Sequence, residues 1–217
     1  MPFSFDLAGT PYTPTKLVCI GRNYAKHARE LGNEVPSEPV VFLKPTSALV
    51  ASGESVVIPP QSTDVHHEVE LVVVIGKTAT KIEEADAMDY VAGYAVGLDM
   101  TARDVQAAAK AKGLPWSTAK GFDTFAPLGD AVSVADAPDL SDATVRLTVN
   151  GEERQSGGTS DMLFSVPFLV AHCSHLFTLY PGDLIYTGTP EGVAQVQAGD
   201  EMVALVDGLP ELRITVR

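Results

Sequence analysis

Two glutamates share one face of a strongly apolar segment. Residues 66–76 read HHEVELVVVIG, and because side chains alternate across a β-strand, Glu68 and Glu70 point to the same face. The residues that follow are apolar at both parities, which predicts that both faces of the strand are buried. Buried carboxylates need partners, since desolvating an unpaired ion costs several kcal/mol. The pattern therefore favours a bound cation here over an ordinary solvated strand face.

A third carboxylate ends another predicted strand. Residues 91–99 read VAGYAVGLD, and Asp99 is followed by TARD, in which Thr101 and Asp104 predict a weak capping-box-like helix start. Alone, Asp99 is typical of such a capping turn. With Glu68 and Glu70 it makes an all-oxygen ligand set, which suits Mg²⁺ or Mn²⁺ and fits zinc poorly.

The helix predicted after Asp99 carries one polar face. Arg103, Gln106 and Lys110 recur at i, i+3 and i+7, and the first two lie close enough to Asp99 to reach what it binds. Three carboxylates and one divalent cation sum to −1, so an anionic ligand needs cations such as Arg103 and Lys120 nearby. This charge argument favours a small organic acid as the ligand.

A second short helix carries a candidate proton-transfer pair. In NYAKHARELG, His27 and Glu30 lie at i and i+3 and are therefore neighbours. Such pairs are most often surface contacts, whereas the functional interpretation is a dyad in which Glu30 orients His27 as a general base. The preceding turn contains Arg22, which we assign to substrate binding, and places the helix as a lid over a pocket.

These residues require a β-rich scaffold. The hydrophobic patterns predict strands over 16–20, 40–43, 68–75 and 91–98, and helices over 24–31, 101–112 and 166–179, the last with Ser165 as N-cap. Asn150-Gly151 and Asp207-Gly208 both suit type I′ hairpin turns. We expect an α+β fold with helices packed on mixed sheet, in a single catalytic domain over 1–217 whose residues 1–15 form an N-terminal extension packed on it.

Composition excludes several classes of protein. The 217 residues carry 15 Lys and Arg against 28 Asp and Glu, a net charge of −13, so nucleic acid is not an expected partner. No apolar run is long enough to span a membrane and no signal peptide is evident, so we expect a cytoplasmic protein. Cys19 and Cys173 lie in apolar segments as buried thiols. Trp116, beside Pro115, is typical of a packing residue.

Several ordered motifs together resemble the fumarylacetoacetate hydrolase family, specifically its short single-domain branch of acylpyruvate hydrolases and oxaloacetate decarboxylases. The resemblance runs from about residue 16 to the C-terminus. The motifs are GRNYAKHARELG, PSEPVVFLKP, HHEVELVVVIGK, GYAVGLDMTARDVQ, KGFDTFAPLG, SDMLFSV and LYPGDLIYTGTPEGV. Two features depart from the family: the N-terminal domain of the fumarylacetoacetate-cleaving members is absent, and Gly129-Asp130 replaces a common Gly-Pro.

The resemblance assigns roles to individual residues. It implies metal ligands at Glu68, Glu70 and Asp99, an active-site lysine at Lys120, and the lid dyad at His27 and Glu30. It also implies substrate contacts from Arg103, Gln106 and Thr189, a fold of mixed sheets in a β-roll, and a homodimer.

Together these observations predict a Mg²⁺- or Mn²⁺-dependent hydrolase that cleaves 3-acylpyruvates, such as fumarylpyruvate or acetylpyruvate, to pyruvate and an acid. This cleavage leaves a pyruvate enolate, which decarboxylation of oxaloacetate would also form. Tautomerisation of oxaloacetate is a further reaction that the same site could catalyse. Two alternatives stay open: a 2-hydroxyhepta-2,4-diene-1,7-dioate isomerase or decarboxylase of aromatic catabolism, and a non-catalytic, metal-dependent binder of dicarboxylates.

Overall fold

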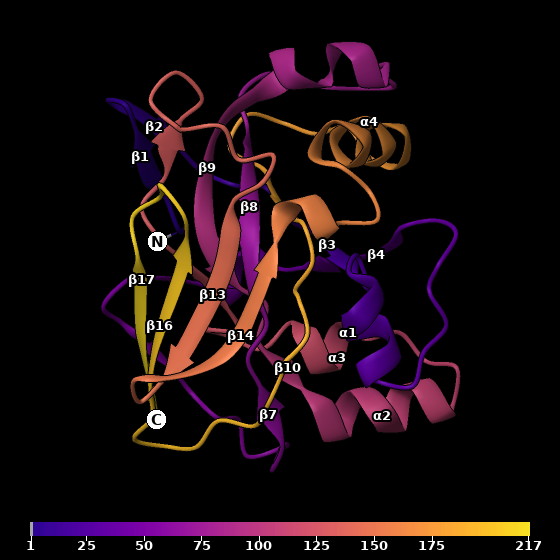
Figure 1. Cartoon of the computed structure of the whole chain (residues 1–217), viewed down its shortest axis with the longest axis vertical. Helices are drawn as coiled ribbons and strands as arrows, with labels where there is room; N and C mark the ends of the chain where they lie inside the picture. Colours follow the sequence, from indigo (N-terminus) through magenta and orange to yellow (C-terminus); the bar gives the residue numbers. More distant parts are fainter. Residues whose placement is uncertain (1) are drawn as a thin grey trace.

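Two curled sheets and four short helices make up the fold, seen in a computed structural model that describes residues 2–217 (Figure 1). The larger sheet has eight strands in the order β4-β3-β15-β8-β9-β11-β5, with β12 also paired to β9. Its strands are β3 (Leu17–Gly21), β4 (Val40–Lys44), β5 (Leu49–Ala51), β8 (Val69–Ile75), β9 (Val91–Leu98), β11 (Ala126–Leu128), β12 (Val132–Ser133) and β15 (Leu184–Tyr186). Parallel and antiparallel pairs both occur, which confirms the mixed sheet.

The second sheet has five strands in the order β14-β13-β16-β17-β6, and two short ribbons complete the β structure. The five strands are β6 (Ser55–Val56), β13 (Thr144–Val149), β14 (Glu152–Gly158), β16 (Glu201–Val206) and β17 (Leu212–Val216), and the ribbons pair β1 (Phe5–Leu7) with β2 (Thr10–Tyr12) and β7 (Val65–His66) with β10 (Thr101–Ala102). In Figure 1, β13 and β14 cross in front of β8 and β9. The two sheets therefore form layers over a shared core.

Strand β8 lies at the centre of that core because both of its faces are apolar. Val69, Leu71 and Val73 belong to the cluster facing the five-stranded sheet, whereas Val72 and Val74 belong to the cluster on the other face. The second face is the one that Glu68 and Glu70 share by alternation. The expected burial on both sides is confirmed.

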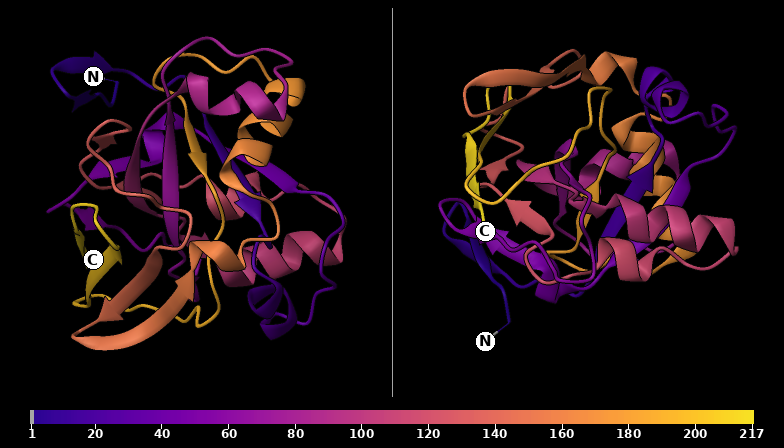
Figure 2. Two further views of the ribbon diagram at one scale, coloured as in Figure 1. Left: turned by 45° about the horizontal axis from the view of Figure 1, so that its top comes forward. Right: turned by 90° about the horizontal axis from the view of Figure 1, so that it is seen from below.

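The helices gather at the edges of the sheets. They are α1 (Ala25–Glu30), α2 (Arg103–Ala111), α3 (Ser117–Lys120) and α4 (Val166–Leu176), with 3₁₀ turns η1 (Thr46–Ala48), η2 (Glu84–Tyr90) and η3 (Thr159–Asp161). Figure 1 and the views in Figure 2 show α1, α2 and α3 at one corner of the molecule, away from α4. Within residues 2–217, no helix combines the length and the apolar character needed to cross a bilayer.

Local expectations are partly confirmed. Ser165 caps α4, its hydroxyl accepting a hydrogen bond from Phe168 N at 3.3 Å. The Asn150-Gly151 turn has φ values of 53° and 81°, as type I′ requires.

Two local predictions were wrong. At Asp207-Gly208 only the glycine has a positive φ and β17 begins at Leu212, so this hairpin has a longer loop and no type I′ turn. Thr101 does not start a helix, because it pairs with His66 in the β7–β10 ribbon, and α2 begins at Arg103 without a side-chain cap.

Candidate metal centre and active site

Strands β8 and β9 bring three carboxylates together. The two strands pair antiparallel with Glu70 opposite Gly97, and Asp99, just past the end of β9, donates its backbone N–H to Glu68 O at 2.8 Å. One carboxylate oxygen from each of Glu68, Glu70 and Asp99 lies within 4.8 Å of the others, and all three residues are at most 5% exposed. The structure thus assembles the triad expected from the sequence.

Glu70 shows why this triad fits a cation. Burial, followed by the charges of Asp99 and Glu68, raises the pKa of Glu70 well above its usual value. Among residues 2–217 its one hydrogen-bond donor is Gly188 N, at 2.7 Å from Oε2. Gly188 has a φ of +99°, and a Cβ there would lie 2.7 Å from Asn23 Cβ, so this donor position requires glycine. A hard divalent cation would satisfy the remaining carboxylate oxygens of Glu70 and its neighbours.

Lys120 is placed between two of the acids. Its Nζ donates to Glu68 Oε2 at 2.8 Å and to Asp99 Oδ2 at 2.6 Å. Burial lowers the pKa of Lys120, but Asp99 and Glu68 raise it more, so the ammonium stays protonated. For Glu68 the balance is the reverse: burial raises its pKa, and Lys120 and Arg103 together bring it well below its usual value.

Lys44 is a site residue that sequence reasoning missed. It is 1% exposed at the end of β4, its Nζ forms an ion pair with Asp99 Oδ1, and it donates to the carbonyl oxygens of Met100 and Phe125. The only signal in the sequence was a lysine that closes the apolar run VVFL before Pro45.

The lid dyad lies against the same site. His27 is 4% exposed, and its Nδ1 lies 3.5 Å from Glu30 Oε2, a close approach that does not meet the geometry of a hydrogen bond in this structure. Glu30 also accepts from Gly192 N at 3.0 Å, which ties α1 to the loop after β15. Burial is the main cause that lowers the pKa of His27, so the imidazole is neutral at pH 7. A buried, neutral histidine is not the exposed surface pair that the alternative interpretation assumed.

Arg103 is already engaged by protein groups. Its Nη2 donates to Glu68 Oε1 at 2.5 Å and its Nη1 donates to Gln106 Oε1 at 2.8 Å. The side chain therefore holds a ligand residue and fixes Gln106, whose amide nitrogen stays available to the pocket.

Gln155 is a second residue that sequence reasoning missed. It is 1% exposed in β14, accepts hydrogen bonds from Val69 N at 3.1 Å, and contacts His67 Nδ1 at 2.9 Å. Its Nε2 donates to Thr189 Oγ1 at 2.8 Å. Because Thr189 accepts here, its own hydroxyl proton is free to be donated to a ligand.

One pocket joins most of these groups. It is lined by Ile20, Gly21, Arg22, His27, Leu31, Asn33, Phe42, Glu68, Glu70, Gln106, Lys110, Trp116, Lys120 and Thr189. Glu30, Asp99 and Arg103 lie behind this lining and contact residues that form it. The free volume is about 30 Å³, which is room for roughly two water molecules. A small organic acid can therefore enter the pocket only if α1 or side chains that line the pocket move.

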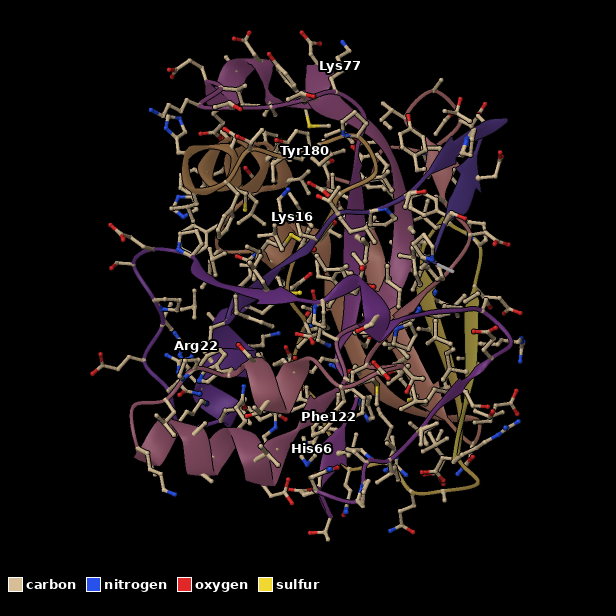
Figure 3. The ribbon with its side chains drawn as sticks, turned by 180° about the vertical axis from the view of Figure 1, so that it is seen from behind. Lys16, Arg22, His66, Lys77, Phe122 and Tyr180 are labelled. Atoms are coloured by element: carbon tan, nitrogen blue, oxygen red, sulfur yellow. The ribbon has the colours of Figure 1, made fainter. Side chains whose placement is uncertain are left out.

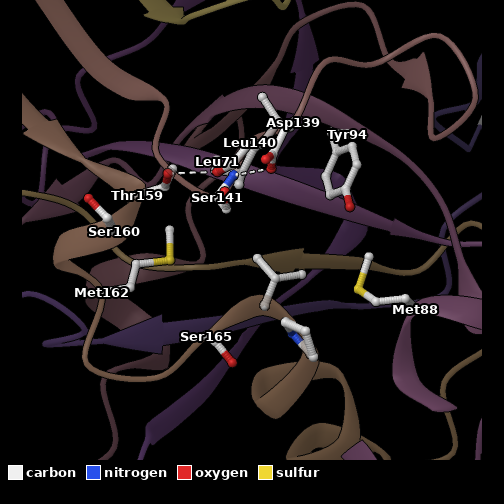
Figure 4. A pocket seen from close by; sticks show the side chains of 12 residues that line it. Leu71, Met88, Tyr94, Asp139, Leu140, Ser141, Thr159, Ser160, Met162 and Ser165 are labelled. Carbon is white, nitrogen blue, oxygen red and sulfur yellow. Dashed lines mark hydrogen bonds between the residues drawn. The ribbon is translucent and has the colours of Figure 1, made fainter. Parts of the chain in front are cut away.

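A larger cavity elsewhere lacks a comparable set of groups. It measures about 380 Å³ and lies between Tyr94 of β9, Met88, Met162 and the start of α4 (Figure 4). The acid that lines it, Asp139, accepts a hydrogen bond from Ser141 N at 2.9 Å. Neither a carboxylate cluster nor a histidine faces this cavity among the described residues.

Comparison with known proteins identifies the family of the chain. The family model described as fumarylacetoacetate (FAA) hydrolase, C-terminal, matches residues 16–217. The chain belongs to the fumarylacetoacetate hydrolase family. It is 53% identical over 202 residues to oxaloacetate tautomerase FAHD1, mitochondrial, of Arabidopsis thaliana, covering 93% of this chain and 91% of the relative.

Solved structures of this family share the fold over nearly the whole chain. Fumarylpyruvate hydrolase from Pseudomonas aeruginosa, solved with Mn²⁺ and pyruvate, is 40% identical with a TM-score of 0.94, covering 99% of this chain and 95% of that one. The 2-hydroxyhepta-2,4-diene-1,7-dioate isomerase from Mycobacterium marinum is 38% identical with a TM-score of 0.84, covering 95% and 75%. The β-rich fold expected from the sequence is therefore confirmed.

Proposed function

We propose that this protein is a Mg²⁺- or Mn²⁺-dependent enzyme that catalyses proton transfer at carbon 3 of small 2-oxo dicarboxylic acids, with keto–enol tautomerisation of oxaloacetate as its reaction. The observation that carries the proposal is a single pocket lined by two carboxylates of the buried triad, an ammonium and a neutral histidine, with the third carboxylate, Asp99, directly behind the lining. The relative named oxaloacetate tautomerase supports the choice of substrate.

Glu68, Glu70 and Asp99 would hold the metal ion. When bound, such an ion supplies a Lewis acid that polarises the oxygens of a 2-oxo acid. The protein's own charges then favour a dianion: the three carboxylates are matched by Lys44, Lys120 and Arg103, so a divalent ion leaves a surplus of two positive charges. The value of −1 expected from the sequence counted only the three carboxylates and the ion; Arg103 and Lys120 were expected nearby, and Lys44 is the cation that sequence reasoning missed.

Lys120 stabilises the negative charge that develops on the substrate. An ammonium has three N–H donors, and two of them are used by Glu68 and Asp99. The third is available to an oxyanion, in a buried setting where such a hydrogen bond is strong. Thr189 Oγ1 and the amide of Gln106 supply further donors that orient the acid.

His27 is the proton carrier in this proposal. With Nδ1 directed to Glu30, Nε2 is the free base, which takes the proton from carbon 3 while Glu30 stabilises the imidazolium. The His27 imidazolium then gives a proton to the 2-oxo oxygen, which restores the neutral histidine, so no water is consumed. Closure of α1 over a pocket of about 30 Å³ excludes bulk water.

Hydrolysis of 3-acylpyruvates is the second candidate, favoured by the solved fumarylpyruvate hydrolase and by the same neutral His27. Here His27 would take a proton from water that attacks the distal carbonyl, and cleavage of the bond to carbon 3 would release pyruvate. The dienedioate isomerase, supported by its solved relative, and a dicarboxylate binder without turnover complete the alternatives.

A paired assay decides between these functions. Metal-loaded protein is supplied with oxaloacetate in deuterated water, where carbon-3 exchange is followed by NMR, and with fumarylpyruvate, where pyruvate release is measured. Tautomerisation predicts exchange that is lost in His27→Gln. Pyruvate release with little exchange would favour hydrolysis, and neither signal despite bound metal would favour the binder.

The cytoplasmic location and the homodimer stay predictions. The Arabidopsis relative is named as a mitochondrial protein, so it gives the cytoplasmic location no support.

A further inference from the structure

Two cations line the active-site pocket without a carboxylate partner. Arg22, between β3 and α1, and Lys110, on α2, both face this pocket. Within residues 2–217, neither has a side-chain carboxylate oxygen within 4.0 Å, whereas Arg103, Lys120 and Lys44 are each paired with an acid of the triad. Of the three cations that line this pocket, Lys120 is therefore paired with acids of the protein, and Arg22 and Lys110 are not.

Trp116 holds the two cations near each other. The guanidinium carbon of Arg22 lies 6.0 Å from the centroid of the indole, and Lys110 Nζ lies 5.2 Å from it. Phe42 packs edge-on against the same ring at 5.7 Å, which fixes its plane. An aromatic ring positions cations without neutralising them, so both charges stay available. Trp116 thus has a positioning role beyond the packing expected from the sequence.

The cluster carries uncompensated positive charge. Partial burial, then the charges of Arg22 and Arg103, lower the pKa of Lys110. Like charges placed together at a pocket without a counter-ion favour the binding of an anion, which relieves their repulsion.

The backbone conformation at Arg22 also supports a role for its side chain. Its φ of +61° lies in the left-handed region, where a residue with a Cβ is less stable than glycine. This position therefore keeps a guanidinium at an energetic cost, at the corner where α1, α2 and α3 meet (Figure 3).

We infer that Arg22 and Lys110 form a second anion subsite that binds the carboxylate of the substrate remote from the triad, so that the pocket selects dicarboxylic over monocarboxylic 2-oxo acids. The guanidinium offers two parallel donors to that carboxylate and the ammonium adds a point charge. This inference rests on the proposed function, because it assigns the substrate class of the same pocket.

The test compares oxaloacetate with its 4-methyl ester, which has the same skeleton but a neutral distal group. Binding to Mn²⁺-loaded protein is measured by titration calorimetry, and kcat/KM for tautomerisation is measured beside it. Lys110→Met and Arg22→Gly should each weaken oxaloacetate binding about tenfold, which corresponds to the lower end of the free energy of a hydrogen bond to a charged group. Binding of the ester should change by less than about twofold.

Lys112→Met is the matched control. Lys112 follows α2 two residues after Lys110, is exposed and does not line the pocket, so its loss removes the same charge without the subsite. The ratio of the two affinities should stay at its wild-type value in this variant. Arg22→Gly removes the guanidinium while relieving the backbone, and its thermal unfolding is measured beside binding, so that lost binding is separated from lost folding.

The outcomes separate the inference from the proposed function. If Lys110→Met and Arg22→Gly lose equal affinity for oxaloacetate and for the ester, or lose affinity for neither, the proposed subsite is wrong. If wild-type protein prefers oxaloacetate, and the preference vanishes in both variants while no turnover occurs, the subsite stands and the proposed reaction fails.

Discussion

The backbone N–H of Asp99 donates to the carbonyl of Glu68 at 2.8 Å, so the residue that follows β9 is held beside the residue that precedes β8. This hydrogen bond extends the antiparallel β8–β9 register by one residue pair beyond Val69 and Leu98. It therefore places Glu68, before the start of β8, next to Asp99, after the end of β9. Lys120 then bridges their side chains. Strand pairing therefore assembles the candidate metal centre, and these contacts predict how changes to the charge of its residues affect the protein.

Glu70→Gln should stabilise the metal-free protein at neutral pH. Because the folded pKa of Glu70 is raised above its unfolded value, its favourable contribution is present at low pH and lost as pH rises through the folded pKa. The variant mimics the protonated form, so the difference in free energy of unfolding should be near zero at pH 4 and should grow towards pH 7.5. Urea denaturation in the presence of a chelator measures it.

If metal-free Glu70→Gln has the same free energy of unfolding as wild type at pH 7.5, or a lower one, then the charge of Glu70 does not destabilise the metal-free protein and this prediction is wrong. With Mn²⁺ present the order should reverse, since wild type gains binding free energy that the variant lacks.

Lys44→Met should destabilise the protein by about 3 kcal/mol, because it leaves Asp99 buried with one oxygen unpaired. Added Mg²⁺ should recover part of this loss by supplying a cation to Asp99. The comparison is chemical denaturation with and without the ion, and Lys26→Met, an exposed lysine on α1, serves as the control. A loss below about 1 kcal/mol would mean that the pair contributes little.

Gln155→Leu should lower both stability and turnover. The change removes partners from His67, Val69 N and Thr189 in a buried setting, which costs about 2 kcal/mol. The loss of turnover should appear in kcat, because Thr189 is no longer oriented. Gln155→Glu, which keeps the shape and the contact to Val69 N, should retain more stability; if both variants behave as wild type, Gln155 does not position the site.

The pH dependence of turnover should report His27. Burial lowers its pKa below the usual 6.5, so the base form persists at pH 7, and kcat/KM should fall only when the pH drops below the folded pKa. In His27→Gln this acidic fall should disappear together with most of the activity. A rate that declines already from pH 7.5 would place the pKa above its usual value and exclude the buried neutral base.

Arg22→Gly should leave the free energy of unfolding unchanged or raise it by up to about 1 kcal/mol, since relief of the left-handed backbone opposes the added freedom of the unfolded chain. Thermal unfolding checks this. A clear loss of stability would show that the Arg22 side chain supports the fold through its contact with Trp116.

Part of the site could be predicted because it depends on local pattern. Alternation placed Glu68 and Glu70 on one face, and helical spacing placed His27 beside Glu30. Asp99 followed from its position at a strand end.

The missed residues depend on contacts that no local pattern encodes. Lys44 is held in the site by hydrogen bonds to carbonyl groups 56 and 81 residues away in the sequence. Gln155 is held there by its hydrogen bond to Thr189, which lies on another segment. The capping prediction at Thr101 was wrong because pairing with His66 outweighed the local helix signal. The type I′ prediction at Asp207-Gly208 was wrong because the dipeptide alone does not fix loop length.

Titration of Mn²⁺ into metal-free protein, with bound metal and the rate of oxaloacetate tautomerisation measured on the same samples, tests the central claim most directly. The account predicts one tightly bound ion per chain, a rate that rises in proportion to bound metal, and loss of both in Glu70→Gln. A full rate in the metal-free protein, or tight binding and full activity in Glu70→Gln, would contradict it.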